Sequence, residues 1–168
     1  MSELVVRYGG EYLNKQDKEQ ASALFKAAST TEALVSLMAF LVVLATAQLA
    51  ETYLAKTPDI AWMFTFFAIN LLANFNTETS TGILQITEKI KLQGTVNLIQ
   101  AIVTTLVIAG AFFFGGSIIV VLIAYLIGKS ILGLGLFTLA QKQLKEKLGS
   151  GWWRTPFSAL TSTRQLIR

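Results

Sequence analysis

The chain has 168 residues, of which 53% are hydrophobic and 14% are charged, and its mean hydropathy is +0.56. This composition is typical of membrane proteins and excludes an ordinary soluble domain. Because the chain contains no cysteine and no histidine, a disulfide framework, thiol chemistry and most zinc sites are excluded, so we expect no metal site and no cofactor.

Residues 1–30 are predicted to form a polar cytoplasmic helix that leads into the first membrane span. A short apolar patch and a break at Gly9-Gly10 come first, and residues 11–26 are rich in good helix formers. The segment has no short apolar region of the kind found in secretory signal peptides, so we expect no cleaved signal.

Four apolar stretches are predicted to cross a bilayer, whose core of about 30 Å needs roughly 20 helical residues. Residues 33–50 and 60–77 are uncharged and fit one crossing each. Residues 92–128 are also uncharged, and together with residues 129–140 they give two spans joined at Gly115-Gly116. The predicted fold is an all-α membrane protein, a single unit over residues 1–168, with four transmembrane helices at about 31–50, 60–79, 95–114 and 117–140.

The segments between the spans carry their own signals. Thr57-Pro58-Asp59 is a good start for the second span, with Thr as N-cap and Pro in the first turn. Residues 83–92 are amphipathic, and Phe112-Phe113-Phe114 mark the outer end of the third span. Residues 141–168 are predicted to be a basic cytoplasmic tail: a helix, a break at residues 149–151, and an interfacial Trp152-Trp153-Arg154 anchor.

Positive charges lie almost entirely on one side of these spans. The other side carries only Lys56. Because positively charged loops stay in the cytoplasm, both termini are predicted to be cytoplasmic, in a multi-pass protein of the inner membrane. The same bias explains the pI near 9.4, so we expect no nucleic-acid partner. The basic residues on the predicted inner side are Arg7, Lys15, Lys18, Lys26, Lys89, Lys91, Lys142, Lys145, Lys147, Arg154, Arg164 and Arg168.

Lys129 is the strongest single candidate for a functional residue, because it lies near the middle of the fourth span. A lysine at that depth costs roughly 2.5–3.5 kcal/mol and should face a helix bundle or a wet cavity. It would there attract an anionic substrate group or join a gating ion pair. Alternatively, the span is shifted and Lys129 lies at an interface, although the apolar residues 131–139 after it argue against that register.

Two polar stripes on the second and third spans are further candidates for a substrate path. Asn70, Asn74 and Glu78 follow an i, i+4, i+8 spacing, which places them on one helix face. Such groups line a cavity or form hydrogen bonds between helices, and Glu78 is alternatively a solvated residue at the inner boundary. The second stripe consists of Gln93, Asn97, Gln100 and Thr104.

Small residues in the fourth span predict close helix packing. Ala124 and Gly128 form a small-xxx-small pair, and Gly133 and Gly135 follow. Signals for an enzyme are absent, because no span carries a pair of carboxylates on one face and no glycine-rich phosphate loop follows a strand.

Three segments resemble the bacterial polysaccharide-export flippases of the multidrug/oligosaccharidyl-lipid/polysaccharide (MOP) exporter superfamily. LVVRYGGEYL (4–13), followed by a polar helix and a span, resembles the inner loop after the second helix of that family. GILQITEKIKLQGTVNLIQAIV (82–103) is similar to the connection between its fourth and fifth helices. GSGWWRTPFSAL (149–160) and RQLIR (164–168) are similar to the connection that leads to its next helical bundle.

The resemblance implies a fold, an activity and partners. The chain would supply about helices three to six of a MATE-like lobe in a transporter of twelve or more helices. Such transporters export lipid-linked oligosaccharide or polysaccharide units, lipopolysaccharide O-antigen among them, by alternating access. Their substrates are usually carried on undecaprenyl pyrophosphate, and Lys129 matches the basic cavity residues by position alone.

Alternating access needs two opposed halves, so the resemblance implies that further helices or oligomer partners complete the transporter. The end of the chain at Arg168 favours a fragment of a longer protein. Two other functions remain open: a multidrug-type exporter of the same superfamily, and a small oligomeric structural or accessory membrane protein whose stripes are subunit contacts. A central lysine fits a cationic drug poorly.

Overall fold

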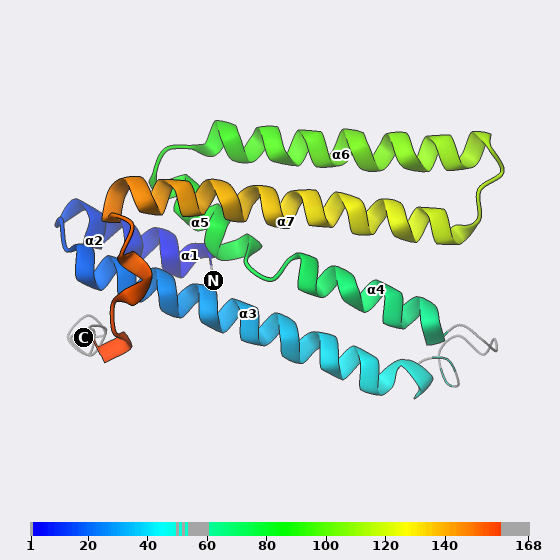
Figure 1. The fold of residues 1–168 in the computed structure, drawn as a ribbon, viewed down its shortest axis with the longest axis horizontal. Helices are drawn as coiled ribbons and strands as arrows, with labels where there is room; N and C mark the ends of the chain where they lie inside the picture. Colours follow the sequence, from blue (N-terminus) through cyan, green and yellow to red (C-terminus); the bar gives the residue numbers. More distant parts are fainter. Residues whose placement is uncertain (1, 50, 52, 54–60, 159–168) are drawn as a thin grey trace. The chain divides into compact units, whose positions relative to one another are not determined.

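The computed structural model describes residues 2–49, 51, 53 and 61–158, and this part of the chain is helical, with no strand (Figure 1). The all-α prediction is confirmed for these residues. The elements are α1 (Ser2–Leu4), the π-helix η1 (Val5–Gly9), α2 (Gly10–Asn14), α3 (Lys18–Leu49), α4 (Ala61–Ala73), α5 (Thr77–Ile86), α6 (Ile90–Phe113), α7 (Ile118–Leu148) and the 3₁₀ helix η3 (Trp152–Arg154).

The chain divides into two compact units. Unit 1 consists of Met1–Glu32, Asn76–Gln93 and Leu136–Arg168, and unit 2 consists of Ala33–Phe75 and Gly94–Gly135. The long helices α3, α6 and α7 each contribute residues to both units. Unit 1 therefore gathers the amino-terminal segment, the second connection and the basic tail, which are the three segments with the excess of positive charge.

Three helices of the described chain are long and apolar enough to cross a membrane: α3, α6 and α7. Their most apolar windows have hydropathies of 1.9 to 2.3, and at most 22% of each window is buried. Most of their apolar surface is thus left for lipid or for further helices.

The prediction of one continuous second span over residues 60–79 is wrong, because α4 ends at Ala73 and α5 begins at Thr77. The residues between them form a turn, since Asn and Thr compete with the helical backbone for hydrogen bonds and favour caps. The 13 residues of α4 cover about 20 Å, less than a bilayer core. The predicted start at Thr57-Pro58-Asp59, and Lys56, lie outside the described residues.

The predicted polar helix over residues 1–30 is also interrupted, but at a different place from the one expected. Gly9 and Gly10 both have helical φ near −63°, so the predicted Gly-Gly break is wrong. Gly9 instead lets the backbone approach the Phe25 ring, where a Cβ has no room. The chain turns at Gln16, whose φ is +57°, and the Asp17 carboxylate accepts the N–H of Gln20 at the start of α3.

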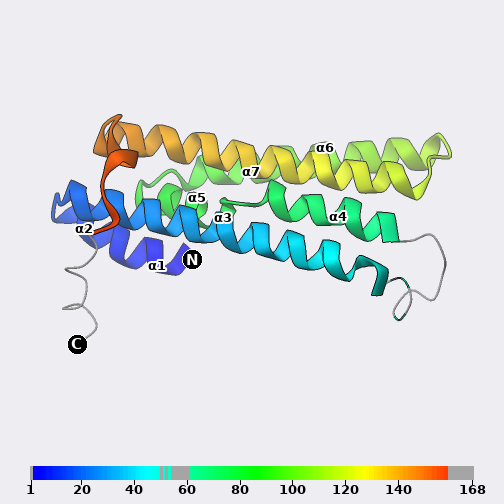
Figure 2. The same ribbon diagram turned by 60° about the horizontal axis from the view of Figure 1, so that its bottom comes forward.

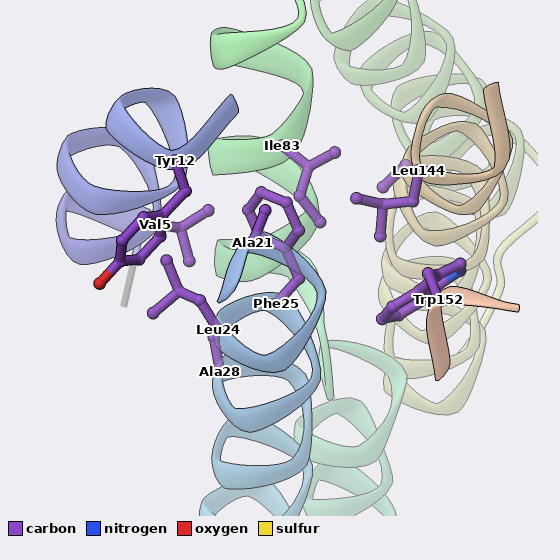
Figure 3. Packing of buried hydrophobic residues seen from close by; sticks show 10 residues of the cluster. Val5, Tyr12, Ala21, Leu24, Phe25, Ala28, Ile83, Leu144 and Trp152 are labelled. Carbon is purple, nitrogen blue, oxygen red and sulfur yellow. The ribbon is translucent and has the colours of Figure 1, made fainter. Parts of the chain in front are cut away.

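Unit 1 has an apolar core built from segments that are far apart in the sequence. Figure 3 shows the side chains of α2, α3, α5 and α7 converging with Trp152 around the fully buried Phe25. The helix α3 contributes at the i, i+3, i+4, i+7 spacing of one helix face. The buried members are Val5, Tyr12, Ala21, Leu24, Phe25, Ala28, Ile83, Ala140, Leu144 and Trp152.

The predicted hairpin between the third and fourth spans is confirmed. Helix α6 ends at Phe113 and α7 begins at Ile118, and Gly115 has φ +66°, a conformation that favours glycine. The Gly116 N–H donates to the Ala111 carbonyl at 2.6 Å and closes the turn. Helix α7 continues to Leu148, so the fourth span and the basic helix of the tail are one element.

Candidate functional site

Within unit 2, α7 lies against the polar face of α6. A methyl group on Gly128 would overlap Thr104 Oγ1 and lie 3.1 Å from Gln100 Nε2, so only a glycine allows this approach. Gln100 Nε2 donates to Thr104 Oγ1 at 3.2 Å, and Thr104 is buried. Asn97, another residue of the predicted stripe, is exposed, and Gln93 is half-buried and belongs to unit 1. The structure therefore brings two of the four predicted α6 residues, Gln100 and Thr104, to the Gly128 contact.

Lys129 follows Gly128 directly and is half-buried. It is the twelfth residue of α7, about 17 Å along the axis from the first residue of that helix. No hydrogen bond or ion pair joins it to any described residue. Its backbone lies beside the Gln100–Thr104 pair, so α7 carries a cation at the level of the α6 polar face.

The predicted stripe on the second span is divided between two helices, and the prediction that its residues share one helix face is wrong. Asn70 lies on α4 and is 5% exposed; its Nδ2 donates to the Phe67 carbonyl at 3.2 Å, and its Oδ1 has no partner among the described residues. Asn74 lies in the turn after α4 and is half-buried. Glu78 lies on α5 in unit 1 and is exposed. Of these three residues, only Asn70 is thus a buried polar group of unit 2.

The glycines of α7 serve close packing, as the sequence predicts. Gly133 faces the carbonyl of Ala73, the last residue of α4, and a methyl group would overlap that oxygen. A methyl group on Gly135 would lie 2.9 Å from a Val96 methyl on α6. Helix α7 therefore contacts α6 and α4 through positions that have no side chain.

A buried carboxylate that sequence reasoning did not select holds the start of α5. Glu32 is 9% exposed and accepts the backbone N–H groups of Glu78 at 2.7 Å and Thr79 at 2.8 Å. Asn76, the N-cap residue, makes no side-chain cap of its own. Glu32 thus supplies the cap from α3, and its negative charge lies at the positive end of the α5 dipole.

The first turns of α5 carry further buried polar atoms. Asn76 Oδ1, Thr79 Oγ1 and Ser80 Oγ are all buried and have no hydrogen-bond partner among the described residues. Buried oxygens of this kind normally bond to protein or water, so this end of α5 offers acceptors and hydroxyl groups to a hydrated or polar ligand.

Unit 1 also contains a polar cavity of about 560 Å³ that none of the predicted site residues lines. Two lysines and Glu88 give it charge, and Lys15 lies beside it in sequence. The Lys15 ammonium donates to the Glu11 carboxylate at 2.6 Å, and this hydrogen bond raises the pKa of Lys15 above its ordinary value. The cavity is lined by Tyr12, Leu13, Asn14, Gln16, Lys18, Ile86, Thr87, Glu88 and Lys147.

A model of the family described as "Polysaccharide biosynthesis protein" matches residues 4–168, nearly the whole chain. The chain belongs to this family. The family consists of polysaccharide and lipid-linked flippases of the MOP superfamily, so the predicted resemblance is confirmed. No curated protein and no solved structure shows a significant match. With its apolar helices, the chain is a multi-pass membrane protein of polysaccharide biosynthesis, from a family of transporters rather than enzymes.

Proposed function

We propose that this chain forms part of a transporter that flips lipid-linked oligosaccharide or polysaccharide units across the cytoplasmic membrane by alternating access. One observation carries the proposal beyond the family: α7 holds Lys129 next to the Gln100–Thr104 pair of α6. A cation within an apolar span costs roughly 2.5–3.5 kcal/mol, and charges are kept at such depth mainly where they act on a substrate or an ion.

Lys129 would attract the pyrophosphate of an undecaprenyl-type carrier. In a medium of low dielectric constant, a lysine ammonium and a phosphate attract each other strongly, and the lysine has no competing anionic partner among the described residues. The amide of Gln100, the hydroxyl of Thr104 and the unpaired Oδ1 of Asn70 would hydrate the path or bond to sugar hydroxyls. Asn74, Glu78 and Asn97 have weaker support as path residues, because they lie in a turn, on α5 and on an exposed face.

The proposed topology places both termini in the cytoplasm. Its support is that unit 1 contains the described parts of all three positively charged segments, although they lie far apart in the sequence. The break between α4 and α5 also fits a transporter, since discontinuous helices are common around substrate sites. Alternating access requires an opposed half, which further helices or partner subunits would supply.

The test replaces Lys129 in the complete transporter. Lys129→Ala is expected to abolish flipping of a labelled lipid-linked oligosaccharide in proteoliposomes, whereas Lys129→Arg retains part of it because the charge remains. Lys145→Ala, which removes an exposed lysine from the same helix, is the matched control. Equal transport by Lys129→Ala and wild type, at equal insertion, would exclude the proposed role of Lys129.

A further inference from the structure

The segment after α7, residues 149–158, folds into a strap whose course is set by Trp152. Gly149 has φ +95° and ends the helix, so the chain reverses there. Trp152 is 4% exposed and packs with Leu144 in the unit 1 core (Figure 3). Because the Trp153 ring stands at 90° to that of Trp152, with centroids 5.0 Å apart, the buried ring fixes the orientation of the exposed one.

Lys26 of α3 holds the strap in place. Its Nζ donates to the Thr155 carbonyl at 3.1 Å and lies 4.5 Å from the centroid of the Phe157 ring and 5.8 Å from that of Trp153. Figures 1 and 2 both show the strap running from the end of α7 to the first part of α3. The Lys26 ammonium group therefore contacts two aromatic rings of the strap and the backbone between them.

The outer side of the strap is aromatic and basic. Trp153 and Phe157 are each 49% exposed, and Arg154 between them is exposed. Residues 141–158 contain four basic side chains and one acidic side chain, which gives a net charge of +3. The four basic residues, Lys142, Lys145, Lys147 and Arg154, are all exposed.

The position of Lys26 along α3 places this surface at the edge of the membrane. Lys26 lies six residues before Glu32, the last charged residue before the apolar run 33–50, which is about 9 Å along the helix axis. The polar layer on each side of a bilayer core is of the order of 5–8 Å thick. Lys26 therefore lies at the outer boundary of this layer, and exposed tryptophan near that boundary is characteristic of membrane interfaces.

We propose that the strap is a docking surface for anionic phospholipid headgroups. Lys26 and Arg154 bind the headgroup phosphate, Trp153 and Phe157 enter the interface beside it, and the lysines of α7 add attraction to the negatively charged leaflet. The charge of the segment favours an anionic lipid over a zwitterionic one. The inference rests on the proposed membrane topology of α3 and does not depend on the transport role of Lys129.

The test uses quenching of Trp153 fluorescence by brominated lipids. The full chain is placed in phosphatidylcholine vesicles that contain the same minor fraction of brominated phosphatidylglycerol or brominated phosphatidylcholine. The fluorescence of Trp153 is obtained as the difference between the emission of wild type and that of Trp153→Phe. We expect the brominated anionic lipid to quench the Trp153 fluorescence severalfold more strongly than the brominated zwitterionic lipid does. Equal quenching of the Trp153 emission by both lipids would overturn the proposal.

Two variants of basic residues separate a specific site from general attraction. Arg154→Gln should remove most of the excess quenching by phosphatidylglycerol. Lys89→Gln removes an exposed charge of unit 1 from the connection between α5 and α6, outside the strap, and should leave the excess intact. An equal loss in both variants would contradict a site on the strap, as would an unchanged excess in Arg154→Gln.

Discussion

The Glu32 carboxylate accepts a 2.8 Å hydrogen bond from the backbone N–H of Thr79, a residue 47 positions further along the chain. A second bond, from the N–H of Glu78, makes Glu32 the cap of α5. Helix α3 and helix α5 are thereby joined by a buried, charge-assisted contact inside unit 1. This contact explains how a chain segment rich in polar residues can leave α4 and start a new helix.

Replacing Glu32 should destabilise unit 1. Glu32→Ala leaves two N–H groups of α5 without their acceptor, and we expect a loss of about 1–3 kcal/mol in the free energy of unfolding. Glu32→Gln, which retains one acceptor oxygen, should lose less. Denaturant unfolding in detergent measures both changes. Glu19→Gln, an exposed carboxylate of the same helix, is the control, and an equal loss there would argue against the cap.

Adding one methyl group to α7 should disturb its contact with α6. Gly128→Ala is expected to destabilise the protein by about 1–3 kcal/mol, because the new Cβ meets Thr104. Gly110→Ala in α6, where a Cβ meets nothing within 4 Å, should be neutral or stabilising by up to about 1 kcal/mol. Thermal unfolding in nanodiscs distinguishes the two variants.

The same contact can be tested by a double substitution. Thr104→Ala removes the hydroxyl that a Cβ on Gly128 would meet, so Thr104→Ala combined with Gly128→Ala should cost less than the sum of the two single changes. A coupling energy of about 0.5–3 kcal/mol is expected for residues in contact. Additive costs would mean that the two helices do not meet at these residues.

Phe25 should be the largest single contributor to the unit 1 core. It is fully buried, and Phe25→Ala is expected to cost about 3–5 kcal/mol. Phe113→Ala, at a side chain that is 81% exposed, should change stability far less. Denaturant midpoints of the two variants provide the comparison, and similar midpoints would contradict the core assignment.

Lys26 should protect the strap from proteolysis. Lys26→Met removes the bond to Thr155 and both ring contacts, which together are worth about 1–2 kcal/mol, so cleavage by trypsin after Arg154 should accelerate by up to about thirtyfold. Lys89→Met is the control, because it removes an exposed lysine of unit 1 from the connection between α5 and α6, outside both α3 and the strap. An unchanged cleavage rate in Lys26→Met would show that the strap is held by Trp152 alone.

Local rules predicted the α6–α7 hairpin and the end of α7, because Gly115 and Gly149 occupy backbone conformations that other residues avoid. They failed between α4 and α5. The spacing of Asn70, Asn74 and Glu78 is compatible with one helix, and the carboxylate that stabilises the second helix start lies on α3. A contact at that separation leaves no periodic signal in the sequence.

The candidate site could be predicted only in part, because the sequence pattern shows which residues share a helix but not which face of that helix is covered. Polar spacing placed Gln100 and Thr104 on one helix, but which face meets α7 depends on Gly128, and Asn97 proved to be exposed. In the amino-terminal segment, the charged residues Lys18, Glu19 and Lys26 made the helix look polar, although one of its faces is apolar and contains Phe25. Whether a helix face is buried or exposed depends on which other helix packs against it, and the sequence pattern of one helix does not contain that information.

Gly128 and Gly133 are five residues apart, which places them about 140° apart around the axis of α7. One faces α6 and the other faces the end of α4, so a sideways shift that loosens one contact tightens the other. Sliding or turning α7 would bring a side chain, in place of a glycine, to Thr104 or to the Ala73 carbonyl, and would push the helices apart. The two glycines therefore fix both the depth and the direction of Lys129 within unit 2.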